Sequence, residues 1–247
     1  MKKIFLVLLL FWICSCGGKH DSIKKETTQN SAAHPSIEKD AWWYYKHTQI
    51  VKNLNKDSQL VLLGDSIFDT LNNEDRKEVW TTYLDQYQTL NMGISGNRTE
   101  NVLWRIENGT LEGINPKVLV LLIGSNNTDG NHYETISTAD ELTEGIWTIC
   151  EKVKKKLPKT KIIVMGILPY GYKANHRNNI NLAVNSRVSK FSKKEPNITY
   201  VDIGDIYKDK NGNVNKALMP DHLHPNAEGH LAMFKALDST IKRLMNQ

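Results

Sequence analysis

The segment KVLVLLIGSNN at residues 117–127 joins six consecutive apolar residues to a short run of small polar ones. The apolar residues do not alternate with polar ones, which is typical of a strand that is covered on both faces. The same pattern recurs in IIVM at residues 162–165. Strands covered on both faces occur in parallel sheets that are connected by helices, so these two segments predict an α/β fold.

Strand and helix patterns alternate along the rest of the chain. Strands are expected at Gln59–Leu63, Thr89–Met92, Val118–Ile123, Lys161–Met165 and Ile198–Ile203. Helices are expected at Ile37–Leu54, Glu74–Leu84, Glu100–Glu107, Thr138–Leu157, Asn179–Lys193 and Ala227–Met245. Five strands separated by helices, with no internal repeat, predict a single α/β domain around one five-stranded parallel sheet with helices on both faces, that is, a three-layer α/β/α arrangement.

The composition excludes several classes of protein. The chain has 247 residues, of which 40% are hydrophobic and 24% are charged. These values are ordinary for a globular protein and exclude a collagen-like or disordered chain. The formal net charge of +5 is too small to indicate nucleic-acid binding. The chain contains neither a P-loop nor a GxGxxG motif, so nucleotide binding is not supported.

The first residues have the features of a secretory signal. Two lysines follow Met1, and the ten apolar residues Ile4–Ile13 are too few to span a membrane as a helix. Ser15 followed by Cys16 resembles the lipobox of bacterial lipoproteins, which implies cleavage before Cys16 and acylation of its thiol. The alternative is a plain signal peptide with incidental cysteines.

This interpretation divides the chain into three segments. Residues 1–15 are expected to be a lipoprotein signal peptide, residues 16–36 a lipidated cysteine with a flexible tether, and residues 37–247 the folded domain. The protein is accordingly expected in a bacterial cell envelope, held at the membrane by its N-terminal lipid.

Small and polar residues follow the predicted strands. Gly64-Asp65-Ser66 follows the first strand, GISGN at residues 93–97 the second, and GSNN at residues 124–127 the third. DHLHP at residues 221–225 follows the last strand after a longer connection. The carboxyl ends of parallel strands meet at one edge of a sheet, which is where ligands bind in open α/β folds. The four segments therefore predict a shared site.

The residue types in these segments suit nucleophilic catalysis. Ser66 can act as the nucleophile if His224 takes its proton, and Asp221 can orient the imidazole. The backbone N–H groups of Ser66 and Gly96, with the side-chain amide of Asn126, can form an oxyanion hole. The sequence therefore predicts a Ser-His-Asp triad with three oxyanion donors.

The same four segments resemble the blocks of the SGNH (GDSL) hydrolase family. Its Ser, Gly, Asn and His match Ser66 in GDS, Gly96 in GISGN, Asn126 in GSNN and His224 in DHLH. The first block reads GDSIFD rather than GDSL, and Ser125 stands where threonine is frequent, but no catalytic group is lost.

The resemblance extends beyond the blocks. Residues 91–127 and 161–171 are most similar to platelet-activating-factor acetylhydrolase catalytic subunits, and bacterial acetylesterases share the DHLHP ending. The family implies a flavodoxin-like sheet, ester hydrolysis through a serine acyl-enzyme, a small acyl group such as acetyl, and neither a metal nor an organic cofactor.

Other roles remain open for some of these side chains. Asp202 and Asp205 are rivals of Asp221 as the orienting carboxylate. Asp221, His222 and His224 could instead ligate a metal, although no HExxH helix or cysteine pair supplies further ligands. Within the triad interpretation, His222 is assigned to the pocket wall or the surface.

Further residues could contribute to substrate binding. Arg98 and Tyr170 flank the expected pocket and could contact substrate, but structural roles are equally compatible with their positions. The aromatic cluster Trp42–Tyr45 could stack on sugars, although packing of a helix against the sheet is the favoured interpretation. Cys150 is expected to be a buried apolar residue.

The sequence therefore predicts a lipid-anchored serine esterase. The expected substrate is an acylated small molecule or glycan, with O-acetyl groups on carbohydrate as the first choice. A phospholipid or platelet-activating-factor-like acetylhydrolase, or a lysophospholipase, is the alternative within the same chemistry. A non-catalytic glycan-binding surface lipoprotein is the alternative of another class.

Overall fold

The computed structural model describes residues 29–171 and 176–247. The predicted signal peptide and Cys16 lie outside the described residues. Five parallel strands form one sheet in the order β2-β1-β3-β4-β5, which is the flavodoxin-like order, as expected. Their bounds are β1 Leu60–Gly64, β2 Leu90–Gly93, β3 Val118–Leu122, β4 Lys161–Met165 and β5 Ile198–Val201.

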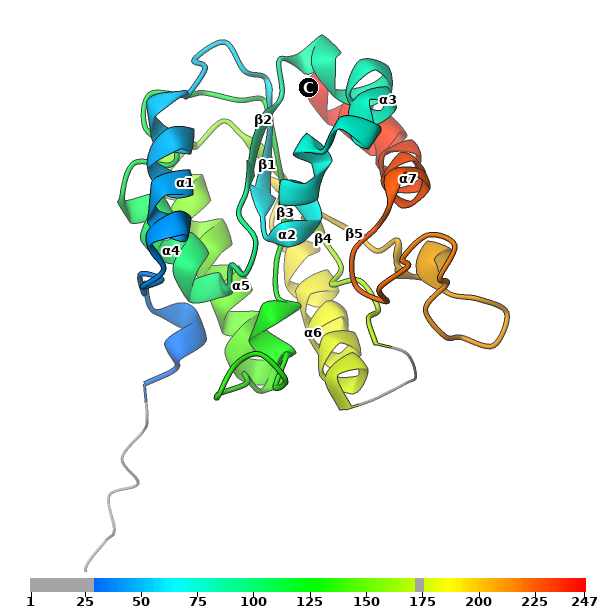
Figure 1. Cartoon of the computed structure of the whole chain (residues 1–247). Coiled ribbons are helices and arrows are strands. Elements are labelled where there is room, and N and C mark those ends of the chain that lie inside the picture. The colour runs from blue at the N-terminus through cyan, green and yellow to red at the C-terminus, as the bar shows by residue number, and fades with distance from the viewer. Residues whose placement is uncertain (1–28, 172–175) are drawn as a thin grey trace, which may run out of the picture.

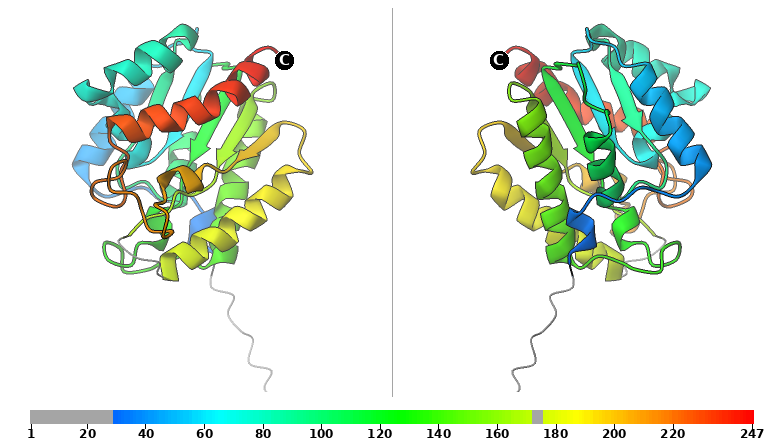
Figure 2. Two further views of the ribbon diagram at one scale, coloured as in Figure 1. Left: turned by 90° about the vertical axis from the view of Figure 1, so that its right-hand side faces the viewer. Right: turned by 90° about the vertical axis from the view of Figure 1, so that its left-hand side faces the viewer.

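Helices cover both faces of this sheet (Figure 1). On one side lie α1 Ala41–Lys52, α4 Thr99–Glu107, α5 Ala139–Lys156 and α6 His176–Ser192. On the other lie α2 Ser66–Asp69, α3 Lys77–Val79 and α7 Ala227–Met245. Figure 2 shows α7 across one face and α5 across the opposite face. The three-layer prediction is confirmed.

Alternate residues of each strand belong to separate cores. In β1, Leu60 and Leu62 pack beneath α7, whereas Val61 and Leu63 pack beneath α4 and α5. This is the period-two geometry of a strand, and it explains why the strand sequences are apolar without interruption. Cys150 is fully buried in the second core, as expected, and burial raises the pKa of its thiol to about 12.

Two segments differ from the sequence expectation. The single helix predicted for Glu74–Leu84 is divided into a 3-10 turn at Glu74–Arg76, the short α3 and a π-helical turn at Trp80–Leu84. Trp80 donates its indole N–H to the carbonyl of Leu71 at 2.7 Å, an interaction outside the segment that periodicity cannot register. The short helix α2 was not among the expected helices. Asp65 caps it by accepting the N–H of Ile67 at 3.0 Å.

The folded part begins before Ile37, so the predicted tether boundary is too late. Asn30 donates its side-chain amide to the carbonyl of Glu141 at 3.0 Å, and Ala32 is fully buried against α5. A Cβ on Gly145 would lie 2.5 Å from the Ala32 carbonyl oxygen, so this contact requires glycine in α5. Among the described residues, no helix is long and apolar enough to cross a membrane.

Candidate active site

The sheet brings the polar loops together at one edge. Gly64, the last residue of β1, pairs with Gly93 of β2 and with Leu122 of β3, so the three following loops start at the same level. Asn97 donates its side-chain amide to the Gly64 carbonyl at 3.2 Å. Ser66 begins α2 two residues after Gly64, and the loop after β2 therefore lies beside it.

Ser66, His224 and Asp221 form a continuous hydrogen-bonded series. The Ser66 Oγ lies 2.9 Å from Nε2 of His224, and Nδ1 of His224 lies 2.6 Å from Oδ2 of Asp221. A proton on Nδ1 that faces the carboxylate leaves Nε2 free to accept the serine hydroxyl proton. The arrangement is that of a nucleophile, a general base and an orienting carboxylate.

The Asp221 carboxylate also organises its own turn. Its Oδ1 accepts the backbone N–H groups of Leu223 at 2.9 Å and His224 at 2.7 Å. Burial opposes ionisation of Asp221, but the hydrogen bonds from the backbone and side chain of His224 outweigh it and lower the pKa of the carboxyl. The two-residue spacing in DHLH is thus the geometry of a side-chain-capped turn.

The rival carboxylates are engaged elsewhere. Asp202 accepts the Tyr200 hydroxyl at 2.9 Å and the Gly204 N–H at 2.9 Å. Asp205 is paired with Lys208 at 2.9 Å. Neither forms a hydrogen bond with His224 in the described part of the chain, so Asp221 is the one of these three carboxylates that contacts the imidazole.

The expected oxyanion donors lie on the three neighbouring loops. Gly96 has φ of +80°, a conformation that favours glycine, and its N–H has no acceptor within the described residues. Asn126 donates one amide hydrogen to the Asn97 carbonyl at 2.9 Å, which leaves the second for a ligand. Ser66 is the first residue of α2, where a backbone N–H has no partner inside the helix.

Asp69 is a supporting residue that the sequence analysis missed. It lies in α2 and accepts both the N–H of Ser95, at 3.0 Å, and the Ser95 hydroxyl, at 2.7 Å. Lys46 of α1 forms an ion pair with the same carboxylate. Asp69 therefore joins the helix that carries Ser66 to the loop that carries Gly96. The sequence feature that could have indicated this role is an acidic residue one helical turn after Ser66.

Two buried ionisable groups contact the peptide groups of Ile67, next to Ser66. Asp65 accepts the Ile67 N–H, and burial raises the pKa of the Asp65 carboxyl to about 6. His230 lies 2.8 Å through Nε2 from the Ile67 carbonyl and 3.2 Å through Nδ1 from Nε of Arg76. Burial, aided by the Arg76 charge, lowers the pKa of His230 to about 4.

The residues expected to border the pocket have protein partners. Arg98 is buried and forms an ion pair with Glu100 at 2.6 Å. The Tyr170 hydroxyl lies 2.8 Å from the Thr128 hydroxyl, and burial raises the pKa of the phenol. His222 has φ of +62°, and its carbonyl accepts the Gly171 N–H at 2.8 Å, so it helps to shape the turn before His224.

The aromatic cluster of α1 is divided between core and surface. Trp43 is 2% exposed and donates its indole N–H to Oδ1 of Asn97 at 2.9 Å, as the packing interpretation requires. Trp42 and Tyr45, by contrast, are 51% and 62% exposed. Packing therefore accounts for only part of the cluster.

No cluster of three or more His, Cys, Asp or Glu residues suited to a metal ion occurs among residues 29–171 and 176–247. In the DHLH turn, His224 contacts Ser66 and Asp221, an arrangement that uses both of its ring nitrogens.

Comparison with known proteins supplies independent observations. Residues 62–232 match the model of the GDSL-like Lipase/Acylhydrolase family. The chain is 30% identical over 224 residues to platelet-activating factor acetylhydrolase IB subunit alpha1 of Bos taurus, covering 89% of this chain and 92% of that protein. It is 32% identical over 223 residues to subunit alpha2 of Rattus norvegicus, covering 88% and 93%.

Solved structures share the fold at lower identity. A putative acylhydrolase from Bacteroides fragilis matches with a TM-score of 0.70 and 20% identity, covering 84% of this chain and all of that one. An acetyl xylan esterase matches with a TM-score of 0.63 and 23% identity, covering 74% and 98%.

Proposed function

The chain belongs to the GDSL-like lipase/acylhydrolase family and is a carboxylic ester hydrolase, and on this premise we propose that Ser66, His224 and Asp221 are its catalytic triad. The observation that carries the proposal is the hydrogen-bonded series from the serine hydroxyl through the imidazole to the carboxylate, at 2.9 and 2.6 Å. Both distances lie within the reach that proton transfer and imidazole orientation require.

The reaction follows from these contacts. Ser66 Oγ bonds to the ester carbonyl carbon while its proton passes to Nε2 of His224. The tetrahedral oxyanion accepts hydrogen bonds from the Ser66 and Gly96 N–H groups and from the Asn126 amide. Collapse breaks the bond to the leaving alcohol, which takes the proton from His224. Water then repeats the sequence on the acyl-enzyme, releasing the carboxylic acid and restoring Ser66.

We propose acetyl esters of carbohydrate as the first substrate class. The fold is shared with an acetyl xylan esterase. The exposed Trp42 gives independent support: the Lys46 ammonium lies 5.3 Å from its ring centroid and is paired with Asp69, which holds Ser95 beside Gly96. An exposed indole that is linked in this way, through Lys46 and Asp69, to the loop of Gly96 offers a flat apolar surface for the face of a sugar ring.

A phospholipid of the platelet-activating-factor type, with a short acyl ester, is the second candidate. It is favoured by the 30–32% identity to acetylhydrolase subunits over nearly the whole chain. A lysophospholipase would require a long acyl chain to be accepted. A non-catalytic glycan-binding protein would retain the fold without turnover, and an intact Ser66–His224–Asp221 series argues against it.

The first experiment measures hydrolysis of p-nitrophenyl acetate by residues 29–247 and by the Ser66→Ala variant. Turnover that vanishes in the variant supports the serine mechanism, and equal turnover in both proteins means that another residue is the nucleophile. Unchanged activity in EDTA is expected, because no step of this mechanism uses a metal ion. The series acetate, butyrate and octanoate then tests the acyl preference, and faster hydrolysis of octanoate would refute the acetyl assignment.

A second experiment distinguishes acetylated carbohydrates from acetylated phospholipids as substrates. Release of acetate is compared between acetylated xylo-oligosaccharides and a 2-acetyl ether phosphocholine. Trp42→Ala should raise KM for the oligosaccharides while leaving p-nitrophenyl acetate hydrolysis unchanged. Trp147→Ala is the matched control, because Trp147 packs on Phe191 at 4.8 Å between α5 and α6. A higher kcat/KM for the phosphocholine than for the oligosaccharides would make the phospholipid the preferred substrate class.

We further propose that Cys16 carries the lipid and holds the protein in a bacterial envelope. The support is the sequence MKK, the apolar segment and the Ser15-Cys16 pair. Mass spectrometry of the N-terminal peptide from membranes tests this directly. Cys16→Ala should release the protein from the membrane fraction, and retention of the variant there would refute lipidation as the anchor.

A further inference from the structure

The connection between β3 and α5 places a tyrosine against the oxyanion loop. Tyr133 donates its hydroxyl to the carbonyl oxygen of Gly96 at 2.8 Å, across 37 positions of the sequence. A Cβ on Gly96 would lie 3.4 Å from the same hydroxyl, so the tyrosine fits closely around the glycine. Burial raises the pKa of Tyr133 to about 12, and the phenol therefore remains a hydrogen-bond donor over the working range of an esterase.

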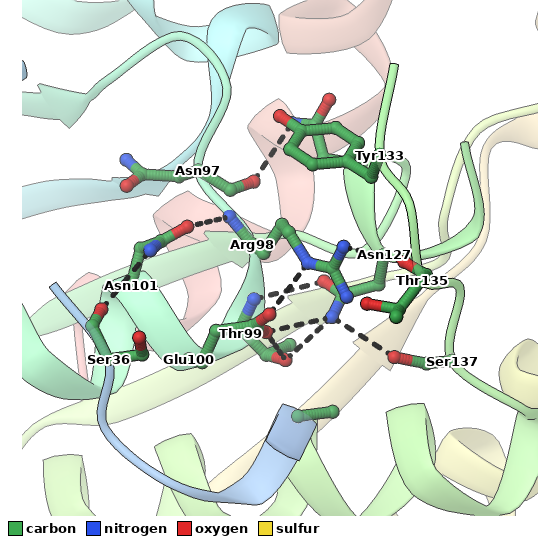
Figure 3. A network of polar contacts seen from close by, with 12 residues as sticks. Ser36, Asn97, Arg98, Thr99, Glu100, Asn101, Asn127, Tyr133, Thr135 and Ser137 are labelled. Atoms are coloured by element: carbon green, nitrogen blue, oxygen red, sulfur yellow. Dashed lines mark hydrogen bonds and ion pairs between the residues drawn. The ribbon is translucent and has the colours of Figure 1, made fainter. Parts of the chain in front are cut away.

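Arg98 holds Tyr133 in place. Its guanidinium lies 5.0 Å from the centre of the Tyr133 ring and donates through Nη1 to the Thr135 carbonyl at 2.8 Å. The ion pair with the nearly buried Glu100, at 2.6 Å, fixes the guanidinium from the other side. Figure 3 shows these side chains gathered between the loop after β2 and the segment that carries Thr135. The tyrosine is thus part of a braced network rather than a free surface group.

Gly96 has particular need of such a contact. It has φ of +80° and no side chain, and glycine has more accessible backbone conformations than any other residue. Ser95 is held by Asp69, and the Asn97 carbonyl is held by the Asn126 amide at 2.9 Å. Tyr133 makes the remaining hydrogen bond, to the carbonyl of Gly96 itself. These contacts together restrain the backbone from Ser95 to Asn97, which includes the Gly96 N–H.

We propose that Tyr133 is a positioning residue that fixes Gly96 as an oxyanion donor. This inference rests on the proposed serine esterase mechanism. The hydroxyl does not touch the substrate. It prevents rotation of the glycine peptide groups and so keeps the N–H preorganised for the charge that develops on the carbonyl oxygen, where preorganised donors act most strongly.

The test compares Tyr133→Phe with Tyr207→Phe. Both variants lose a single hydroxyl that donates to a glycine carbonyl at 2.8 Å; Tyr207 donates to Gly229 in α7. We expect Tyr133→Phe to lower kcat on p-nitrophenyl acetate about tenfold, equivalent to about 1.4 kcal/mol, with little change in KM. Its affinity for a methylboronic acid, which forms a tetrahedral adduct with the serine, should weaken by a similar factor. Tyr207→Phe should lose stability but keep both quantities near wild type.

Each outcome bears on a separate statement. Unchanged kcat and boronic-acid affinity in Tyr133→Phe, beside wild-type turnover that requires Ser66, would overturn the role of Tyr133 alone. Equal losses in the Tyr133→Phe and Tyr207→Phe proteins would also overturn it, because general loosening would then explain both. Absence of turnover that depends on Ser66 in the wild type would overturn the proposed function, and the role of Tyr133 with it.

Discussion

Acid should destabilise this protein through His230, which joins α7 to Ile67, the residue after Ser66. The imidazole is fully buried, with Nε2 2.8 Å from the Ile67 carbonyl and Nδ1 3.2 Å from Nε of Arg76. The neutral ring satisfies both contacts by donating through Nε2 and accepting through Nδ1. A second proton would place a cation beside the Arg76 guanidinium. We therefore expect His230→Gln, whose amide can also donate and accept, to remove a pH-dependent contribution to stability.

The size and sign of this contribution follow from the two protonation equilibria. The pKa of His230 is about 4 in the folded protein and 6.5 for an unperturbed histidine. Because the folded value is depressed, the stabilisation is complete above pH 6.5 and is lost as pH falls towards 4. The difference between these two pKa values corresponds to about 3 kcal/mol of unfolding free energy over the whole pH range, and to about 2 kcal/mol between pH 7.5 and pH 5.

The assay is urea denaturation of wild type and His230→Gln at pH 7.5 and pH 5. Other groups titrate in this range, so the decisive quantity is the loss of unfolding free energy between the two pH values, compared between proteins. His230→Gln should lose about 2 kcal/mol less than wild type. The exposed His34 supplies the control His34→Gln, which should behave as wild type. Equal losses in wild type and His230→Gln would refute the assignment of a buried neutral imidazole.

Three further outcomes are expected. Asp65→Asn should show the opposite pH dependence to His230→Gln, because the raised pKa of about 6 means that ionisation of the Asp65 carboxyl destabilises the fold as pH rises from about 4 to 6. In urea denaturation at pH 7.5 and pH 4, the variant should gain stability relative to wild type at pH 7.5, and an equal gain at pH 4 would contradict this. Asn126→Ala should lower kcat about 10²–10³-fold in p-nitrophenyl acetate assays. Asn126→Asp should lower it further, because a carboxylate then faces the negative charge of the oxyanion. If Asn126→Asp is faster than Asn126→Ala, Asn126 is not an oxyanion donor. Asp221→Asn should lower kcat about 10³-fold or more with a normal KM, because the amide can stabilise the wrong His224 tautomer; near-normal kcat would show that another group orients the imidazole.

The layered fold could be predicted because its signals are local. The uninterrupted apolar segments of β3 and β4 are typical of strands that are covered on both faces. The helix α7 begins and ends where its apolar periodicity predicts. Glu74–Leu84 could not be predicted in the same way. The indole of Trp80 donates to the carbonyl of Leu71, outside that segment, and apolar periodicity within the segment does not register such a contact.

The chemical groups that meet at the edge of the sheet could be identified from local patterns, namely the apolar strands and the small polar segments that follow them. The contacts that hold those groups in place depend on how the layers pack. Asp69 accepts hydrogen bonds from Ser95, and Tyr133 donates one to the Gly96 carbonyl. His230 forms a hydrogen bond with the Ile67 carbonyl, 163 positions away in the chain. Such contacts join residues that share no spacing rule, because they depend on the packing of whole helices and loops, and so they become visible only once the layers are assembled.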